Sequence, residues 1–274
     1  MRRLSYVDNG SDKLIIVFQS AGRVPTEKIK AYLNKNISDQ DIKKFHGKYN
    51  WYSMAKRMPI ADYYFLEDHY SGIYGWYISD FGKNIISTIQ NEIENIVSKK
   101  EYKMVIAFGS SKGGTGALIH GLISPYISKI FTLVPQINIT RYIEEHLPEI
   151  KHLLMPMESK ECNEELMGNI MNYLDISKIK RRKTVFFYTG ILDEQFAETR
   201  LFSRKLSSEL ISSTLIMNVE RKGHSPMVMD NVEFIEKVLS NILNQTRTED
   251  DDLFKIDPKT FLYLGKSKEK VSEK

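Results

Sequence analysis

Apolar runs of the strand type alternate with helical stretches through most of the chain, and this alternation limits the fold more than any other sequence feature. Residues 14–18 are almost continuously apolar, as is typical of a strand buried on both faces of a sheet. Further runs of this kind lie at residues 62–66, 104–108, 130–134, 184–188 and 214–219. Helical patterns lie near residues 82–98, 112–123, 195–211 and 229–244. The order predicts an α/β fold with a mostly parallel central sheet and helices on both faces.

A chain of 274 residues with 42% hydrophobic and 27% charged residues is typical of one globular domain. We expect this domain to cover residues 1–246. One small helical, cap-like insertion at 137–180 interrupts the β/α alternation. Residues 247–274 are rich in charge and predict a solvated tail, although a short apolar patch at 261–264 lies within it.

The charge and cysteine content narrow the class of partner and the compartment. A net charge of +4 is too small and too dispersed to indicate a nucleic-acid-binding protein. Cys162 is the single cysteine, which excludes an internal disulfide and a metal site built on clustered thiolates. The sequence has neither a secretory signal nor an apolar run of about 18 residues, which predicts a cytoplasmic protein without a transmembrane segment. The oligomeric state stays open.

The motif G-x-S-x-G occurs at residues 109–113, with Ser111 at its centre. The pattern alone is weak, because a glycine-rich turn also lets a helix pack closely on a strand. Here it follows a buried strand and opens an apolar helix, which is the setting of a nucleophile elbow. Glycines two residues before and after the serine avoid collisions in the tight turn. The motif therefore predicts an α/β-hydrolase fold with Ser111 as the nucleophile.

An elbow at a helix N-terminus also directs backbone N–H groups toward an oxyanion that forms beside the serine. The backbone N–H of Lys112 is the expected first donor. A second donor normally comes from the loop after an earlier strand, and Ser20 lies in that loop after residues 14–18.

A serine nucleophile needs a base, and this fold supplies the base late in the chain. His224 follows the last predicted strand and precedes the last predicted helix. Asp193 follows the strand before it, which gives the order Ser, Asp, His expected of this fold. Glu194 is adjacent, and an Asp after a strand is often a turn residue or a helix cap.

Two other site types are disfavoured. Residues 112–116 resemble the phosphate loop of nucleotide-dependent ATPases, but Ala117 and Leu118 stand where such a loop needs Lys followed by Ser or Thr. The remaining histidines, His46, His69, His120, His146 and His152, lack the spacing of metal ligands. We therefore expect no metal.

Several short motifs together resemble one group of bacterial proteins. They are residues 109–118 with Gly121 and Leu122, residues 18–21, Pro135 with Gln136, residues 190–193, and Gly223 with His224. The chain is similar at these positions to the α/β-hydrolase-fold capsule polysaccharide O-acetyltransferases and to the related hydrolase-like proteins of the accessory secretion system. The insertion and the charged tail do not match.

The resemblance implies that Ser111 passes an acetyl group from acetyl-CoA, a co-substrate and not a bound cofactor, to a hydroxyl of a capsular or surface polysaccharide. The same acyl-serine serves a carboxylesterase or deacetylase that acts on a small ester or an acetylated glycan, with water as the acceptor. A third reading is a non-catalytic assembly component of glycan or glycoprotein export. Peptidase activity is disfavoured, because no peptide-binding element is identified.

Overall fold

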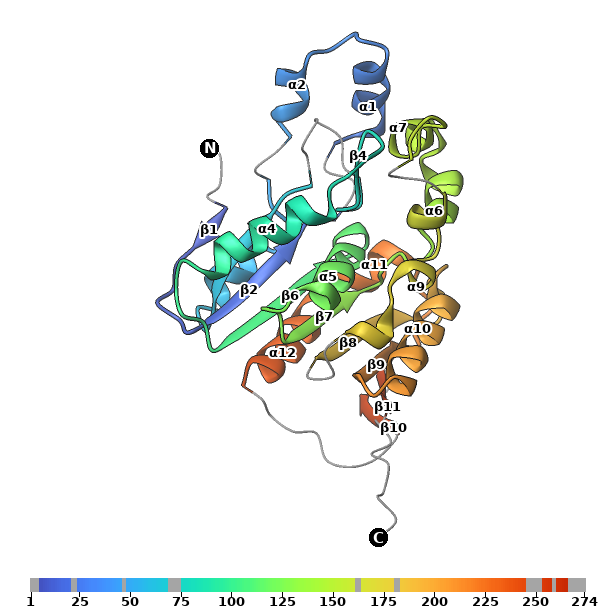
Figure 1. The fold of residues 1–274 in the computed structure, drawn as a ribbon. Coiled ribbons are helices and arrows are strands. Elements are labelled where there is room, and N and C mark those ends of the chain that lie inside the picture. Colours follow the sequence, from blue (N-terminus) through green and yellow to red (C-terminus); the bar gives the residue numbers. More distant parts are fainter. Residues whose placement is uncertain are drawn as a thin grey trace.

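The structure, a computed structural model, describes residues 5–20, 24–45, 48–68, 75–160, 164–179, 183–244, 253–257 and 260–265. Their main feature is one nine-stranded sheet with the strand order β1-β3-β2-β6-β7-β8-β9-β11-β10 (Figure 1). The strands are β1 Tyr6–Val7, β2 Lys13–Phe18, β3 Asp62–Leu66, β6 Met104–Ser110, β7 Lys129–Leu133, β8 Thr184–Gly190, β9 Ser212–Asn218, β10 Leu253–Asp257 and β11 Thr260–Gly265. The six strands from β3 to β9 in this order run parallel to one another. They are the six strands that the sequence predicts.

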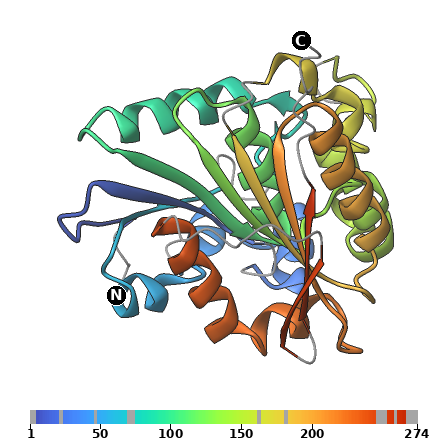
Figure 2. The same ribbon diagram turned by 90° about the horizontal axis from the view of Figure 1, so that it is seen from below.

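Helices cover both faces of the sheet (Figure 2). On one face lie α4 Ile86–Val97, α5 Lys112–Ile123 and α10 Phe196–Ser208; on the other lie α3 Tyr52–Arg57, α11 His224–Met229 and α12 Val232–Leu243. Along β2, Leu14, Ile16 and Phe18 join the first core and Ile15 and Val17 join the second. This alternation explains the continuous apolar run, because both sides of the strand are buried. The predicted fold class is confirmed.

Two excursions project from the carboxyl edge of the sheet, one more than the sequence predicts. The predicted insertion contains α6 Ile139–His146, η1 Pro148–Ile150, α7 Lys151–Leu154, α8 Glu164–Met167, α9 Ile170–Tyr173 and η2 Ile176–Lys178. The unpredicted one, between β2 and β3, carries α1 Thr26–Leu33 and α2 Asp39–Lys43 before α3. Figure 1 shows α1, α2 and α7 at the same end of the molecule. A small hairpin of β4 Ser79–Asp80 and β5 Lys83–Asn84 precedes α4.

The part of the predicted tail that the structure describes forms two strands. Strand β11 pairs antiparallel with β9, and β10 pairs antiparallel with β11. The apolar patch at 261–264 lies in β11, opposite residues 214–217 of β9. A short strand pattern between charged flanks thus extends the sheet. The domain boundary at residue 246 stays a prediction.

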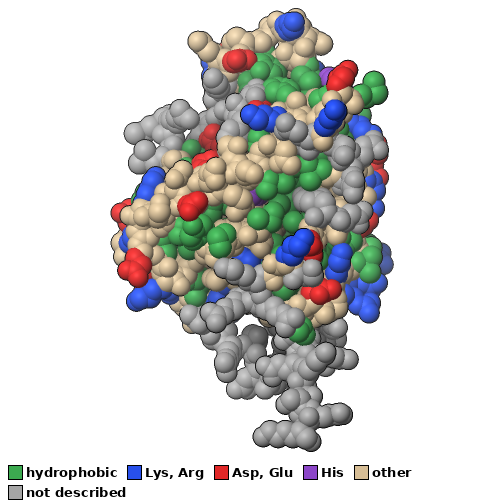
Figure 3. All heavy atoms as spheres, in the orientation of Figure 1, with side chains coloured by type: hydrophobic (Ala, Val, Ile, Leu, Met, Phe, Trp, Pro, Cys, Tyr) green, Lys and Arg blue, Asp and Glu red, His purple; other side chains and the backbone are tan. Residues whose placement is uncertain are grey.

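The surface and the helices add two observations. Basic and acidic side chains are interspersed on the face shown in Figure 3, in keeping with a small net charge. None of the helices in the described ranges has the length and apolar character that a membrane crossing requires.

A buried carboxylate ties the start of β3 to the segments that precede β2 and β6. The Asp62 side chain is fully buried at the start of β3. Burial by itself would raise the pKa of this carboxyl, but hydrogen bonds from Lys100 and from the backbone N–H groups of Ser11 and Asn9 outweigh it and lower the pKa to about 2. The hydroxyls of Tyr6 and Tyr102 also donate to Asp62 Oδ2. The ionised form therefore stabilises the fold.

We predict that Asp62→Asn lowers the free energy of unfolding at pH 7 by about 2 kcal/mol, because the folded pKa lies almost two units below the ordinary value. The stabilisation is complete above the unfolded-state pKa and disappears as the pH falls through the folded-state pKa. Urea denaturation of both proteins from neutral pH down to about pH 2 measures it. A difference between them that stays constant over this range would contradict the assignment.

Candidate active site

Ser111 occupies a strained turn between β6 and α5. Its backbone angles are φ 56° and ψ −125°, in a region that non-glycine residues rarely adopt. Its N–H donates to the carbonyl oxygen of Leu133 on the neighbouring β7, at 2.9 Å. Strain of this kind persists only where the surroundings fix the backbone, and it concentrates at functional sites.

The two glycines of the motif are required by close backbone contacts. A Cβ atom on Gly109 would lie less than 3.0 Å from the carbonyl oxygen of Gly113. One on Gly113 would lie less than 3.0 Å from the carbonyl oxygen and carbon of Phe18, at the end of β2. The elbow can therefore form only where both positions lack a side chain.

The structure brings together the three residues predicted as nucleophile, base and acid. Ser111 Oγ lies 2.8 Å from Nε2 of His224, and His224 Nδ1 lies 2.7 Å from Oδ2 of Asp193. Because an ionised carboxylate only accepts, Nδ1 carries the proton and Nε2 accepts from the serine hydroxyl. Three separate strand ends supply the residues, since β6, β8 and β9 all finish at the same edge of the sheet.

The Asp193 carboxylate is held in place by a second contact. The backbone N–H of Gln195 donates to Oδ1 of Asp193 at 2.9 Å, and the Asp193 side chain is 1% exposed. The adjacent Glu194 points elsewhere, with Oε2 at 2.8 Å from His146 Nε2. Of the two neighbouring carboxylates, only Asp193 bonds to His224.

The residues predicted to supply the oxyanion donors both lie near the serine. Lys112 is the first residue of α5, and Ser20 follows β2 and lines the same pocket as Ser111. Their role in binding an oxyanion stays a prediction.

The Lys112 side chain forms a buried ion pair that the sequence does not predict. Its Nζ lies 2.8 Å from Oδ2 of Asp68, just after β3, and 4.6 Å from the centre of the Tyr77 ring. Both charged side chains are at most 1% exposed. Burial raises the pKa of the Asp68 carboxyl and lowers the pKa of the Lys112 amine, while the attraction between the two charges opposes both shifts. The pair joins the base of α5 to β3.

Gln136 is a further residue at the serine. It follows β7, and its Nε2 donates to Ser111 Oγ at 3.2 Å. Two signals in the sequence pointed to it: its position after a parallel strand, as for Ser111, Asp193 and His224, and its place in the Pro135–Gln136 motif. A glutamine there has no chemical signature in the sequence.

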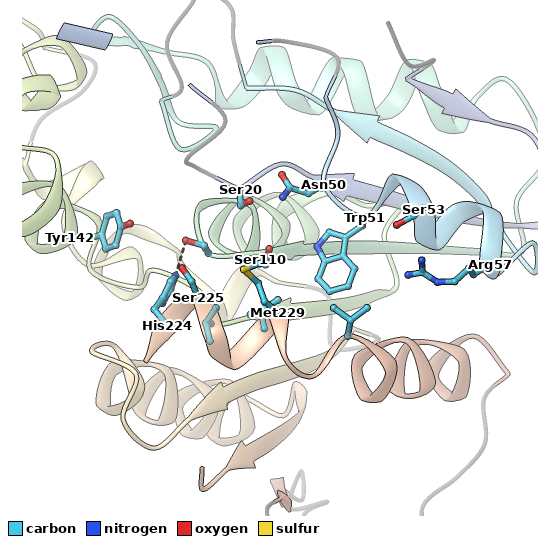
Figure 4. Close-up of a pocket in the computed structure, with 14 residues that line it drawn as sticks. Ser20, Asn50, Trp51, Ser53, Arg57, Ser110, Tyr142, His224, Ser225 and Met229 are labelled. Atoms are coloured by element: carbon cyan, nitrogen blue, oxygen red, sulfur yellow. Dashed lines mark hydrogen bonds between the residues drawn. The ribbon is translucent and has the colours of Figure 1, made fainter. Parts of the chain in front are cut away.

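A pocket of about 640 Å³ opens beside the serine (Figure 4). It extends from Tyr142 and His224 at one end to Arg57 at the other, with Trp51 and Asn50 between them. The full lining is Ser20, Asn50, Trp51, Ser53, Arg57, Ser110, Ser111, Val134, Tyr142, His224, Ser225, Val228, Met229 and Val232. The β2–β3 excursion thus forms one wall and α11 with the start of α12 the other.

Two other histidines of the described residues, His120 and His146, have very different surroundings. His120 is fully buried, its Nδ1 faces Nε2 of Gln90, and its Nε2 faces the carbonyl oxygen of Tyr77. Burial lowers the pKa of His120 to about 4, so the ring is neutral at pH 7. Ligand atoms of Glu145, His146 and Glu194 lie within 4.8 Å of one another, but all three residues are exposed. His46 and His69 lie outside the described residues.

No protein-family model and no curated protein matches the chain in sequence. Solved structures do match. The capsule O-acetyltransferase of Neisseria meningitidis serogroup A aligns with a TM-score of 0.57 and 15% identity over 85% of this chain and 87% of that one. An alanine variant of that enzyme in complex with CoA gives a TM-score of 0.58 and 16% identity over the same shares.

Two other neighbours have similar scores. The Glycosylation Associate Protein complex of Streptococcus agalactiae gives a TM-score of 0.53 and 14% identity over 87% of this chain and 43% of that one. A Pyrococcus furiosus esterase gives a TM-score of 0.52 and 16% identity over 88% of this chain and 84% of that one. These neighbours confirm the α/β-hydrolase fold and the resemblance stated from the motifs. At such identities the likeness extends to the fold alone.

We predict that Gly113→Ala lowers the free energy of unfolding by about 1–3 kcal/mol or prevents folding, because the new methyl group would meet the Phe18 backbone. Chemical denaturation measures the change. Gly223→Ala is the matched control, since no atom lies within 4 Å of a Cβ atom there. Equal stability of the two variants would show that the elbow is looser than described.

A second prediction concerns the buried ion pair. Lys112→Met should destabilise the protein by about 3–5 kcal/mol, because it leaves the Asp68 carboxylate buried without its counter-charge. Adding Asp68→Asn removes that charge, so the double variant should be less destabilised than the sum of the two single variants. The four proteins are compared by urea denaturation at pH 7. Additive effects would mean that the two groups do not stabilise each other.

Proposed function

We propose that the chain is a serine-dependent acyl-transfer enzyme in which Ser111 is the nucleophile, His224 the general base and Asp193 the residue that orients the imidazole. The observation that carries the proposal is the continuous hydrogen-bonded chain from Ser111 Oγ through His224 to Asp193, at 2.8 and 2.7 Å. It opens onto a pocket of about 640 Å³, within the range of small-molecule sites.

The first half-reaction acylates the serine. As Ser111 Oγ forms a bond to the acyl carbonyl carbon, its proton passes to His224 Nε2, and the carbonyl oxygen becomes an oxyanion facing the backbone N–H groups of Lys112 and Ser20. The bond from the carbonyl carbon to the leaving thiol or alcohol then breaks. The leaving group takes the proton from His224, and the acyl-serine ester remains.

The second half-reaction removes the acyl group from Ser111 and regenerates the free enzyme. A hydroxyl of the acceptor gives its proton to His224 and attacks the acyl-serine carbon. The bond from that carbon to Ser111 Oγ then breaks, and the serine takes the proton back from His224. A sugar hydroxyl as the acceptor makes the protein a transferase, and water makes it an esterase or deacetylase.

We favour O-acetyl transfer from acetyl-CoA to a bacterial capsular or surface polysaccharide over simple ester hydrolysis. The support is the motif resemblance and the fold shared with a capsule O-acetyltransferase, one variant of which is described in complex with CoA. The pocket combines polar groups with the indole of Trp51, and Arg57 at its far end is paired with Glu236. Such a lining suits a ligand that is polar and partly flat.

We predict that the native protein releases p-nitrophenol from p-nitrophenyl acetate and that Ser111→Ala reduces kcat by about 10³-fold or more, because the attacking atom is lost. Asp193→Asn should lower kcat strongly as well, since it disturbs the His224 tautomer. Acetyl-CoA supplied with a panel of bacterial polysaccharides should yield acetylated glycan, detected by mass spectrometry.

Each alternative has its own outcome in this assay. Ser111-dependent turnover into water without any acetylated glycan supports the esterase or deacetylase. The absence of Ser111-dependent turnover of every ester and donor tested would refute the enzymatic proposal and leave the assembly component.

A further inference from the structure

Gln136 is fixed beside the nucleophile by its own backbone. Its N–H donates to Thr115 Oγ1 at 2.9 Å, and its carbonyl oxygen accepts from the same hydroxyl at 2.9 Å. Thr115 lies in the first turn of α5, and its N–H donates to the Ser111 carbonyl oxygen. Hydrogen bonds through Thr115 thus hold Gln136 and Ser111 in fixed positions relative to each other.

A buried indole fixes which way the Gln136 amide faces. Nε1 of Trp76 lies 2.5 Å from Oε1 of Gln136, and both side chains are fully buried. An indole N–H only donates, so the atom that it contacts must be the amide oxygen. The amide nitrogen therefore faces Ser111 Oγ, at 3.2 Å.

The direction of both bonds at the serine follows from this orientation. An amide nitrogen donates and does not accept, so Ser111 Oγ accepts a hydrogen bond from Gln136. The hydroxyl proton is then directed to the other neighbour, His224 Nε2, at 2.8 Å. Before any substrate binds, the hydroxyl proton of Ser111 thus faces His224 Nε2, and a lone pair of Ser111 Oγ faces the Gln136 amide.

From this geometry, and resting on the proposed acyl-transfer function, we infer that Gln136 is a further catalytic residue and that Trp76 is its positioning residue. The Gln136 N–H stays bonded to Ser111 Oγ and transfers no proton. It stabilises the negative charge that grows on Oγ as the serine proton leaves, and again when the bond from Oγ to the acyl carbon breaks. A preorganised donor at an atom that gains charge stabilises the transition state more than the ground state.

The central test is Gln136→Met, which keeps approximately the side-chain length and removes the donor. We expect kcat/KM for p-nitrophenyl acetate, and the rate of covalent labelling by a fluorophosphonate, to fall about 10- to 100-fold, the range for a hydrogen bond to a group that becomes charged. KM should stay unchanged, because the contact is to the nucleophile and not to the substrate. A rise in KM at constant kcat would overturn the inference.

Two further variants separate the chemical role from a structural one. Trp76→Phe keeps Gln136 but releases its amide oxygen, so it should lower kcat in the same step by a smaller factor. Gln90→Met is the matched control, since that glutamine bonds to His120, away from Ser111, and its loss should leave the labelling rate unchanged. Thermal unfolding of each variant shows whether it is folded.

The outcomes distinguish the two proposals. If the native chain shows Ser111-dependent turnover and labelling while folded Gln136→Met keeps both rates within about twofold, a loss far smaller than a hydrogen bond to a charged group supplies, only the role of Gln136 is refuted. If Gln136→Met does not fold, Gln136→Glu is used instead, because its carboxyl group has a similar shape and cannot donate once it is ionised; native rates at the high-pH end of its pH profile would also refute the role. A native chain that neither turns over esters nor becomes labelled would refute both.

Discussion

The close packing of the first turn of α5 against the end of β2 determines the position of everything else in the site. Gly113 lies against the Phe18 backbone so closely that no side chain fits between them. This contact forces the chain into the strained conformation of Ser111, whose N–H is then bonded to β7. Since β6, β7, β8 and β9 are parallel, their carboxyl ends bring Ser111, Gln136, Asp193 and His224 to one edge. The geometry of the candidate site is thus a consequence of sheet topology and one backbone contact.

Close to this edge, Lys112 and Asp68 form a buried ion pair at a place where apolar side chains would also fill the space. Removing the charges of Lys112 and Asp68 from water is unfavourable, and their attraction only partly offsets it. The pair has a directional effect that apolar side chains lack. It links the residue after the nucleophile to the end of β3, while the Tyr77 hydroxyl contacts the backbone of Gln19, next to Ser20. The two elements predicted to supply oxyanion donors are therefore connected through buried polar contacts.

The sequence predicts the parts of this structure that have a strong period or a chemical signature. Six strands and the helices α4, α5, α10 and α12 were predictable because each buries a continuous or periodic apolar surface. Helices α1 and α2 have eight and five residues, too few turns for a clear period. Strands β10 and β11 lie among charges that obscure their pattern. For the site, Ser, His and Asp are recognisable by type and order, whereas Gln136 matters only through the direction of its amide, which Trp76 determines from a distant part of the sequence.

The parts of the site that the sequence predicts and the parts that it does not predict are proposed to have different roles. The residues proposed to carry out the chemistry lie in the turns after sheet strands or at the start of the helix that follows, so their positions follow from the core. The pocket beyond them is formed by Asn50, Trp51, Ser53 and Arg57 from the β2–β3 excursion and by α11 and α12. Arg57 is itself paired with Glu236 of α12, which joins the two walls. Under the proposed function, selection of the acyl donor and acceptor would depend on elements that can change in length and sequence without disturbing the elbow.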